Sequence, residues 1–514
     1  MNFSILDWSV LGGYFAVVSA LGVMLSQRSA RSSKDFFLSR NGFPVVLIVF
    51  SVLATTQSAA TFLGGPDFGF RKDYTYLAGN LGSILAAIVA ACVLLPRFYA
   101  AGVMTVYDLL NKAFGPTAMR SAGAMYLLGR VFANGARLFM AALAVALIVF
   151  SNTHFISVAL SSLFITFIAL AFTFVGGLRS VVASDALQFA VYVGTAIFIL
   201  IGLYQVLNLP LSDLLTAARN APDGQDKLVV FDFSLDLTNP FTMLSIFTGV
   251  ALLSIGSYGL DQDTTQRLLA AGSPQRAGRA IVIATVLAIP LTFVFLSIGQ
   301  LLHIFYERPE VTGRETVDLE LEGTTVFMRY ILDELPSGIR GLAVTGVIAA
   351  AVSTLNSGLN SMAAVAVSDF YRPMTDEKPE RHYVMVGQFA MFGFATVLFL
   401  MSCLCYFWQK SSDSPLLEFA LAVMTFAYAG LLGVYGTVFF TNRGSTGSVV
   451  GGLIAGFVVM CLGERSIGGG LGIPESYTSL AFSWKLCVAT LVSFAVTVSG
   501  NTRRPSSVPG AVPG

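Results

Sequence analysis

The sequence SVLATTQSAAT, residues 51–61, places five hydroxyl groups and one primary amide in the middle of an apolar segment. Hydroxyl groups alone are common where membrane helices pack closely. Gln57 is different, because a buried primary amide needs several hydrogen-bond partners. A run this polar suits a locally unwound helix whose free carbonyls coordinate a cation, as in the discontinuous helices of secondary transporters. We therefore interpret residues 51–61 as a break inside a membrane helix.

The rest of the chain has the composition of a membrane protein. Of its 514 residues, 55% are hydrophobic and 11% are charged, against roughly 25% charged in soluble domains. The 30 Lys and Arg nearly balance the 29 Asp and Glu, so no basic excess indicates nucleic acid binding. A bilayer is crossed by about 20 apolar residues. The sequence predicts an all-α integral membrane protein with about thirteen transmembrane helices, at residues 8–26, 44–65, 77–100, 121–150, 155–175, 182–207, 241–260, 280–305, 338–368, 384–408, 416–440, 448–462 and 480–498.

The charged loops predict the orientation of these helices. With the N-terminus outside, Lys and Arg are in excess in the inner connections, which is the positive-inside distribution. Trp8, Trp408 and Trp484 then lie at the outer ends of their spans, as aromatic belt residues do. The long outer connections, 208–240 and 306–337, are expected to be solvated and to contain short helices. We expect a protein of the bacterial inner membrane, with the N-terminus outside and the C-terminus in the cytoplasm.

A second polar stretch lies in the ninth span. Small and hydroxyl side chains recur there at steps of three or four residues and so share one helix face: Ala350, Ser353, Thr354, Ser357 and Ser361. Such a face is either a seam for close helix packing or a site for a hard cation, which prefers oxygen ligands. Both can hold, because a close seam brings two helices near enough to share one ion.

Charged residues inside a bilayer are costly and tend to face the bundle interior. Arg130, Asn134 and Arg137 share one face of the fourth span. Arg130 lies near the membrane midplane, where its partner is either an anionic substrate or an internal carboxylate. Arg137 lies nearer the outer side, which favours a structural or snorkelling role. Asp185, near the inner end of the sixth span, is either a helix-start carboxylate or part of an ion path.

Together these stretches resemble the sodium:solute symporter family, which includes sodium-coupled sugar, proline and sialic acid carriers. Four stretches carry the resemblance: residues 54–62, residues 176–179 (GGLR) with 184–188, residues 261–267 (DQDTTQR), and the small-residue ninth span ending in residues 368–371 (SDFY). Each stretch alone is a weak indication of the family, but the four stretches in this order along thirteen predicted spans are specific to it.

The resemblance implies a LeuT-type core of two inverted five-helix repeats, with one leading and two trailing helices. The implied divisions are residues 1–43 for the leading helix and a cytoplasmic loop, 44–207 for the first repeat, 208–240 for an outer loop, 241–440 for the second repeat, 441–499 for the trailing helices and 500–514 for a disordered cytoplasmic tail. The second and seventh spans become the discontinuous first helices of the repeats. Gly249, Gly256 and Gly259 mark the expected break in the seventh span.

The resemblance also implies where sodium binds. The main ion is expected between the second and ninth spans, held by the carbonyls of Ala54, Gln57 and Ala350 and by the hydroxyls of Ser353 and Thr354. A second sodium site, present in some members, would use Asp185, Ser353, Asn356 and Ser357. Asn356 stands where those members carry a hydroxyl.

The substrate cavity is expected beside the second, third, fourth and seventh spans, near Thr56, Ser58, Thr61, Asn80, Arg130 and Ser254. Tyr258 is a candidate inner gate, with simple packing as its alternative. By resemblance, Arg130 matches the carboxylate-binding arginine of sialic acid carriers, and a guanidinium offers a two-pronged match to a carboxylate. The implied function is sodium-coupled import by alternating access of a sugar acid or another organic anion. Sugars and amino acids are the alternative substrates.

Other classes of function fit the sequence less well. An enzyme would need converging nucleophiles, acids or metal ligands, and the predicted spans contain no His/Glu/Asp cluster. A sensor built on the same fold usually carries a soluble signalling domain, whereas a short tail is expected here. Proton coupling would require a titratable carboxylate at the main ion site, which is neutral. The expected partners are sodium ions, one small solute and the bilayer, with no nucleic acid and with a monomer as the simplest state.

Overall fold

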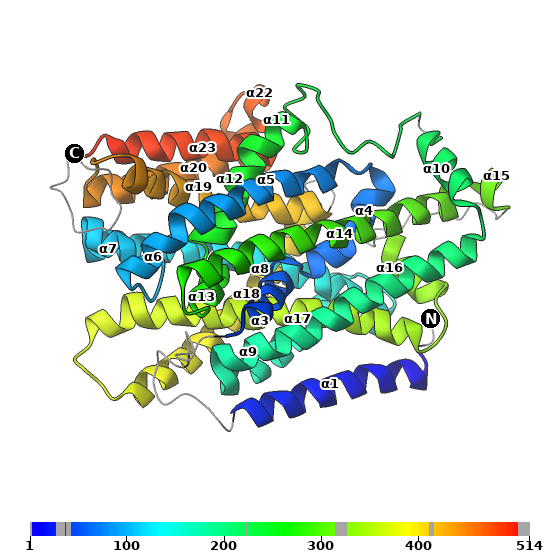
Figure 1. Cartoon of the computed structure of the whole chain (residues 1–514), viewed down its shortest axis with the longest axis horizontal. Helices are drawn as coiled ribbons and strands as arrows, with labels where there is room; N and C mark the ends of the chain where they lie inside the picture. The colour runs from blue at the N-terminus through cyan, green and yellow to red at the C-terminus, as the bar shows by residue number, and fades with distance from the viewer. Residues whose placement is uncertain are drawn as a thin grey trace.

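The computed structural model describes residues 3–26, 36, 43–222, 224–313, 326–410 and 416–501. Long helices run side by side along the longest axis of the molecule (Figure 1). Every element named in the described ranges is helical, and extended backbone pairs there only at an isolated bridge between Asp232 and Thr242. The predicted all-α fold is confirmed.

The number of membrane-crossing helices is close to the prediction. Among the described residues, 10 helices are long and apolar enough to cross a bilayer, or up to 11 when a bent pair is taken as one span. Ile5–Ala20 and Phe482–Val498 are apolar but shorter. The count of thirteen therefore stays a prediction.

The first half of the chain holds the broken second span. Its elements are α1 (Ile5–Ser26), α3 (Val45–Thr56), α4 (Ala59–Arg71), α5 (Thr75–Val89), the π-helical η1 (Ala90–Leu94), α6 (Leu95–Ala101), α7 (Asp108–Phe114), α8 (Pro116–Phe150), α9 (Phe155–Leu207) and α10 (Leu211–Arg219). Two of the predicted spans lie in α9, at Phe155–Thr173 and Ser180–Leu207.

The predicted break in the second span is confirmed. α3 ends at Thr56, α4 begins at Ala59, and the two helices are bent by 61°. Gln57 and Ser58 between them have extended backbone, with ψ of 95° and 178°. The amides of Thr61 and Phe62 bond to the carbonyl of Ser58, at 2.9 and 3.0 Å, and so start α4 afresh. The polar run therefore unwinds the helix without Gly or Pro at the break.

The second half of the chain holds the second broken span and the central helix. Its elements are α11 (Met243–Ser245), the π-helical η2 (Ile246–Val250), α12 (Ala251–Ile255), the π-helical η3 (Gly256–Leu260), α13 (Gln262–Leu269), α14 (Pro274–Glu307), α15 (Pro309–Thr312), α16 (Val326–Asp333), α17 (Ile339–Val365), η4 (Ala366–Tyr371), η5 (Arg372–Met374), α18 (Glu380–Lys410) and α19 (Leu416–Phe440).

The break in the seventh span does not lie at the glycines where it was expected. Gly249, Gly256 and Gly259 lie in helical backbone, inside the π-helical segments η2 and η3. The helix ends at Leu260, and Asp261 is extended, with φ −91° and ψ 118°. The Asp261 carboxylate accepts a hydrogen bond from the amide of Asp263 at 2.9 Å and so begins α13. A side chain that caps the next helix, rather than a flexible glycine, sets the break.

The chain ends in α20 (Thr446–Gly463), α21 (Arg465–Gly468), η6 (Gly469–Leu471), α22 (Glu475–Thr478) and α23 (Phe482–Val498). The predicted short helices of the outer connections are confirmed as α10, α15 and α16. Most of the predicted inner loop after α1, residues 27–35 and 37–42, and most of the predicted tail, residues 502–514, lie outside the described residues.

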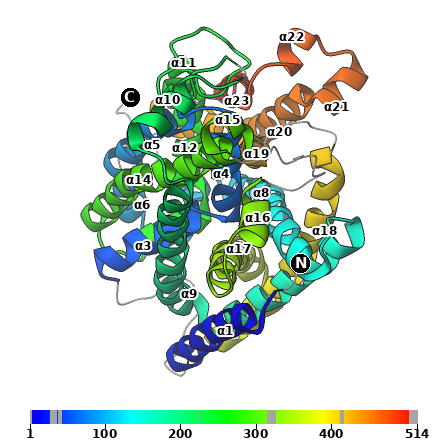
Figure 2. The ribbon, with the colours of Figure 1, turned by 90° about the vertical axis from the view of Figure 1, so that its right-hand side faces the viewer.

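α17 lies at the centre of the bundle. Figure 2 looks along it and shows α1, α8, α9 and α18 around it, and α17 packs against each of these helices. Within its most apolar stretch, 94% of the residues are buried. The polar face predicted for the ninth span is therefore turned towards other helices and away from lipid.

The leading helix also fixes where α17 begins. The carboxylate of Asp7 accepts hydrogen bonds from the amides of Gly338 and Gly341, at 2.7 and 2.8 Å. Asp7 is fully buried. A Cβ on Gly341 would lie 2.6 Å from the Cα of Asp7, so only glycine permits this approach. α1 thus caps the helix that carries the predicted ion ligands.

Replacing Asp7 with alanine is expected to lower stability by about 1–3 kcal/mol, because the buried amide of Gly341 and the half-buried amide of Gly338 lose their acceptor. Thermal unfolding of the detergent-purified protein measures the effect. Asp7→Asn is the matched control: it keeps one amide oxygen as an acceptor and should lie between wild type and alanine. Equal unfolding temperatures for all three proteins would show that this cap contributes nothing.

Two glycines set the close packing of α4 on α14. A Cβ on Gly69 would lie 2.4 Å from the carbonyl oxygen of Leu296, and one on Gly299 would lie 2.2 Å from that of Pro66. Small residues at such crossings let membrane helices touch through their backbones. α4, the second half of the broken span, is therefore held firmly against α14.

Candidate functional site

A cavity of about 130 Å³ lies between the broken second span and the seventh span. Its walls come from α3, α5, α8, α12, η3, α13, α14 and α19, and they consist of Val52, Thr55, Thr56, Gln57, Tyr76, Asn80, Ser83, Arg130, Arg137, Leu253, Ser254, Ser257, Tyr258, Thr264, Ile281, Ala284, Thr285, Ala288, Thr292, Leu421 and Met424. The cavity brings together four predicted substrate residues, Thr56, Asn80, Arg130 and Ser254, and the candidate gate Tyr258. Ser58 and Thr61 are not part of its lining.

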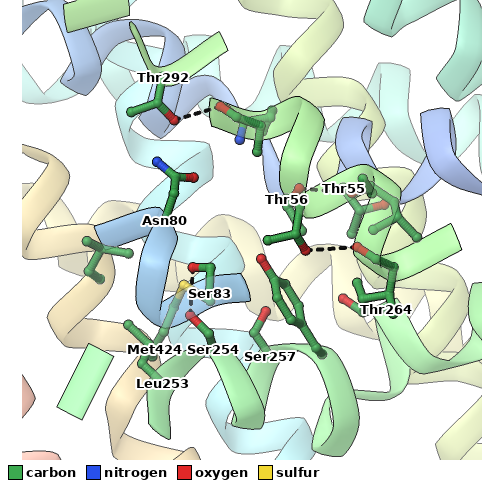
Figure 3. Close-up of a pocket in the computed structure, with 18 of the residues that line it drawn as sticks. Thr55, Thr56, Asn80, Ser83, Leu253, Ser254, Ser257, Thr264, Thr292 and Met424 are labelled. Carbon is green, nitrogen blue, oxygen red and sulfur yellow. Dashed lines mark hydrogen bonds between the residues drawn. The ribbon is translucent and has the colours of Figure 1, made fainter. Parts of the chain in front are cut away.

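The cavity walls present hydroxyl and amide groups to one another. In Figure 3, Asn80 and Thr56 lie on opposite sides, and Ser83, Ser254 and Ser257 lie at one end. The hydroxyls of Ser83 and Ser254 are 3.0 Å apart and join α5 to α12. The Thr56 hydroxyl donates to the carbonyl of Val52 at 3.0 Å, which leaves its oxygen as an acceptor. Such walls suit a solute with several hydroxyl or amide groups.

Several lining residues were missed by sequence reasoning, although the sequence holds a signal for some of them. Ser257 follows Ser254 by one helical turn, and Ser83 follows Asn80 by the same step. Thr264 lies inside the DQDTTQR stretch, which was quoted for its resemblance but was given no role. Tyr76 precedes Asn80 by four residues and so lies on the same face of α5. Thr292 and Met424 carry no such signal, because only the fold brings α14 and α19 to the cavity.

Arg130 is held by two buried carboxylates. Its Nη2 lies 2.7 Å from Oδ1 of Asp261 and 2.9 Å from Oδ2 of Asp263, and its Nε donates to Asp261 at 3.1 Å. The hydroxyl of Tyr428 on α19 donates to the other oxygen of Asp261. The structure thus contains the internal carboxylate that was the alternative partner for Arg130. The role of Arg130 as a substrate ligand stays a prediction.

The ion pairs continue from Arg130 towards α9. Asp263 also receives Nη1 of Arg267 at 2.7 Å, and Nη2 of Arg267 lies 3.1 Å from Oδ2 of Asp185. All five charged side chains are at most 4% exposed. We call this set, Asp261, Arg130, Asp263, Arg267 and Asp185, the ion-pair chain. Buried charges are tolerated when each has an opposite charge within contact distance, and here each does.

Arg137 is different from Arg130, although both line the cavity. It lies seven residues further along α8, about 10 Å at 1.5 Å per residue. The residue is 9% exposed, and its Nη2 donates to Sδ of Met424 at 3.3 Å. Within the part of the chain that the structure describes, no carboxylate lies within ion-pair distance of it. A sulfur atom is a weak acceptor, so this guanidinium keeps most of its capacity to bind an anion.

The break in the second span frees the two carbonyls predicted to bind sodium. In a continuous helix, the amides of Ser58 and Thr61 would bond to Ala54 and Gln57. Here the extended backbone at Gln57 turns the amide of Ser58 away from Ala54, and the amide of Thr61 bonds to the carbonyl of Ser58 instead. Across from the break, the Thr354 hydroxyl lies 3.0 Å from the Ala350 carbonyl on α17, so both oxygens can face one ion. α17 packs against both α3 and α4.

The residues predicted for a second sodium site are only partly brought together. The hydroxyl of Ser353 donates to Oδ1 of Asp185 at 2.6 Å. Ser357 instead donates to Asp263, at 2.5 Å. The Asn356 amide is turned to the other side, where its nitrogen can donate to the carbonyl of Ala169 at 2.9 Å and to the hydroxyl of Thr173 at 3.0 Å.

Comparison with known proteins agrees with this architecture. Residues 36–456 match the model of the sodium:solute symporter family. The chain is 24% identical over 467 residues to the sodium/sialic acid symporter of Proteus mirabilis, covering 89% of each protein. It is 25% identical over 524 residues to the human sodium/iodide cotransporter, covering 98% of this chain and 78% of that protein.

A solved structure of a substrate-bound, outward-open Na⁺-coupled sialic acid symporter superposes with a TM-score of 0.80 at 20% identity, over 97% of this chain and 98% of that one. This likeness confirms the predicted LeuT-type fold. The coupling ion of the family is sodium, as predicted. The chain belongs to the sodium:solute symporter family.

Proposed function

We propose that this protein imports a small organic carboxylate, such as a sugar acid, together with sodium by alternating access. The observation that carries the proposal is the guanidinium of Arg137, which lines a polar cavity and has no carboxylate partner among the described residues. A buried cation without a counter-ion is unfavourable. A substrate carboxylate would supply that charge and match the guanidinium with two parallel hydrogen bonds.

The polar walls around Arg137 support a substrate that is more than a simple anion. Asn80, Ser83, Ser254 and Thr56 can bond to hydroxyl or amide groups at a distance from the carboxylate. Gln57 also lines the cavity, and its Oε1 atom is buried without a hydrogen-bond partner. A donor on the substrate would satisfy it. The names of two relatives point the same way, because sialic acid and iodide are both anions.

Arg130 and Arg137 then have different roles. Asp261 and Asp263 already neutralise Arg130, so a substrate carboxylate gains less from it. Arg130 holds the inner parts of α8 and α13 together, and it can still touch the substrate from the cavity wall. Arg137 carries the charge recognition.

Sodium couples to the substrate through the broken span. An ion held by Ala54, Gln57, Ala350, Ser353 and Thr354 would fasten the break against α17. Thr56 and Gln57 belong to the same break and line the cavity, so ion binding shapes the substrate site. Each ligand then raises the affinity for the other by the same factor. We place the protein in a bacterial inner membrane with the N-terminus outside.

The proposal is tested by uptake into proteoliposomes under an inward sodium gradient, with potassium in place of sodium as the control. The probes are N-acetylneuraminic acid, lactate, glucose and proline. Sodium-dependent uptake of a carboxylate supports the proposal. Uptake of glucose alone would contradict the assignment of a carboxylate. Uptake at acid pH that is as fast in potassium as in sodium would contradict sodium coupling.

Replacing Thr354 with alanine is expected to weaken sodium binding about tenfold, because the ion loses one hydroxyl ligand. The change is measured as the sodium concentration that gives half-maximal thermal stabilisation. Thr345→Ala is the matched control, since that hydroxyl lies on the same helix and donates to the carbonyl of Gly341 at 2.7 Å. If both variants respond to sodium like wild type, Thr354 is not a ligand.

A further inference from the structure

A second cavity, of about 330 Å³, lies between α9, α10 and α14, and it shares no lining residue with the substrate cavity. The short helix α10 lies beside the end of α14 (Figure 1). It supplies one wall of the cavity through four apolar side chains in the i, i+3, i+4, i+7 pattern of an amphipathic helix: Leu211, Leu214, Leu215 and Ala218. α10 therefore turns its apolar face to the cavity.

The cavity opens towards the bilayer. Its other main walls come from α9 and α14, and both helices contain spans long and apolar enough to cross a membrane. Ile201 of α9 and Phe293 of α14 line the cavity and are 52% and 50% exposed, so they form its rim on the lipid-facing side. An apolar cavity of about 150 Å³ already binds benzene and stays free of water. A larger apolar cavity that opens sideways can therefore hold a hydrocarbon chain.

One polar group in the cavity wall lacks a partner. Gln300 is 3% exposed, and its Nε2 donates to the carbonyls of Lys72 and Lys227, at 3.1 and 3.3 Å. These two acceptors fix the amide with its nitrogen towards them. The oxygen, Oε1, is buried and has no hydrogen-bond partner among the described residues. A buried acceptor without a donor is unfavourable, so a ligand that fills the cavity gains by bringing one.

We propose that this cavity binds one single-chain lipid with an uncharged hydroxyl head group, such as a monoacylglycerol, taken from the surrounding leaflet. The hydroxyl of the lipid donates to Oε1 of Gln300. The chain runs along α14 towards Phe293, seven residues and about 10 Å nearer the middle of that helix. The head group is uncharged because no charged side chain of the described residues lines the cavity.

Gln300 connects the bound lipid to the broken second span. The carbonyl of Lys72, one of its two acceptors, lies at the C-terminal end of α4. Lys227, which provides the other, donates from its Nζ to the carbonyl of Phe70 at 3.1 Å. The preceding residue, Gly299, forms the close crossing of α14 with α4. A lipid held by Gln300 therefore strengthens the contact between α4 and α14.

The first test measures binding to the whole protein in nanodiscs of phosphatidylcholine, a lipid without a hydrogen-bond donor. The probe is a monoacylglycerol with a photoreactive group in its chain, and mass spectrometry identifies the labelled peptides. We expect the label on α10 and on the second half of α14. Unlabelled 1-oleoylglycerol should displace the probe, and methyl oleate, which has the same chain but no hydroxyl, should need an about tenfold higher concentration because it lacks one hydrogen bond.

Three results of this test would overturn the proposal. The first is label spread evenly over the lipid-facing helices, which indicates ordinary contact with the bilayer. The second is equal competition by the two unlabelled compounds, which means that no acceptor recognises the hydroxyl. The third is the absence of label, which means that another part of the chain fills the cavity.

The second test uses two variants. Ile201→Trp places a large side chain at the rim of the cavity and should abolish the labelling of α10. Val206→Trp is the matched control, because Val206 is an exposed residue of the same helix outside the lining, and it should label like wild type. Gln300→Leu removes the acceptor, so 1-oleoylglycerol and methyl oleate should then compete equally.

Unchanged labelling in Ile201→Trp would contradict the proposed site. A folded Gln300→Leu protein that still prefers 1-oleoylglycerol would contradict the proposed hydrogen bond. If Gln300→Leu does not fold, the comparison of Ile201→Trp with Val206→Trp decides, together with the competition in wild type.

Discussion

Replacing Arg137 with alanine is expected to weaken binding of the transported carboxylate on the order of 100-fold, or about 3 kcal/mol, because the substrate loses its charged partner in a buried site. The binding of sodium in the absence of substrate should hardly change, since Arg137 does not belong to the predicted ion ligands. The measurement is the carboxylate concentration that gives half-maximal thermal stabilisation in saturating sodium.

Arg137→Lys is the matched control for charge. Lysine keeps the positive charge but loses the planar pair of donors, so binding should recover only in part. Asn80→Ala tests the polar wall separately and should affect a hydroxylated carboxylate more than a short one such as lactate. If Arg137→Ala binds the carboxylate as tightly as wild type, the substrate charge is recognised elsewhere, and Arg130 becomes the next candidate.

Replacing Arg130 with methionine is expected to lower the stability of the protein by about 3–5 kcal/mol. The change leaves Asp261 without its arginine and removes one of the two cations that contact Asp263, and breaking a buried ion pair from one side is strongly destabilising. The unfolding temperature and the yield of monodisperse protein in detergent both report on the effect.

Arg137→Met is the matched control for Arg130→Met. It removes the same side chain from the same helix, two turns away, without leaving a carboxylate unpaired among the described residues. Its unfolding temperature should remain near that of wild type. The opposite pattern, with a stable Arg130→Met protein that no longer binds the carboxylate, would show that Arg130 and not Arg137 is the substrate ligand.

The pattern of the second span shows how far local sequence can lead. Five hydroxyls and Gln57 in an apolar segment indicate a break, and the structure has one at Gln57 and Ser58. Backbone groups in lipid must find partners within their own segment, so a polar interruption is visible without knowledge of the neighbours. In the seventh span, the predicted position of the break was wrong. The glycines of that span suggested a flexible point, but the capping carboxylate of Asp261 sets the break.

The two arginines of α8 show where sequence reasoning ends. Spacing and depth identified both as interior charges and favoured a structural role for Arg137, whereas the substrate role of Arg130 was implied by the family resemblance. Which of them has a carboxylate nearby depends on Asp261 and Asp263 at the start of α13, which lie 131 and 133 residues from Arg130 in the chain. No local pattern records that approach. The partner of each charge could be known only after the helices were packed.

The sequence by itself determined the membrane setting, the helical fold, the broken second span and the family, because each follows from hydropathy, backbone pairing or short motifs within a few turns of chain. The tertiary structure decided which charges pair, which oxygens surround Arg267, and which guanidinium remains for a substrate. The physical reason is the range of the interactions. A helix in lipid forms its hydrogen bonds within its own segment, whereas the partner of a buried charge is whichever side chain the packed bundle brings within about 3 Å of it.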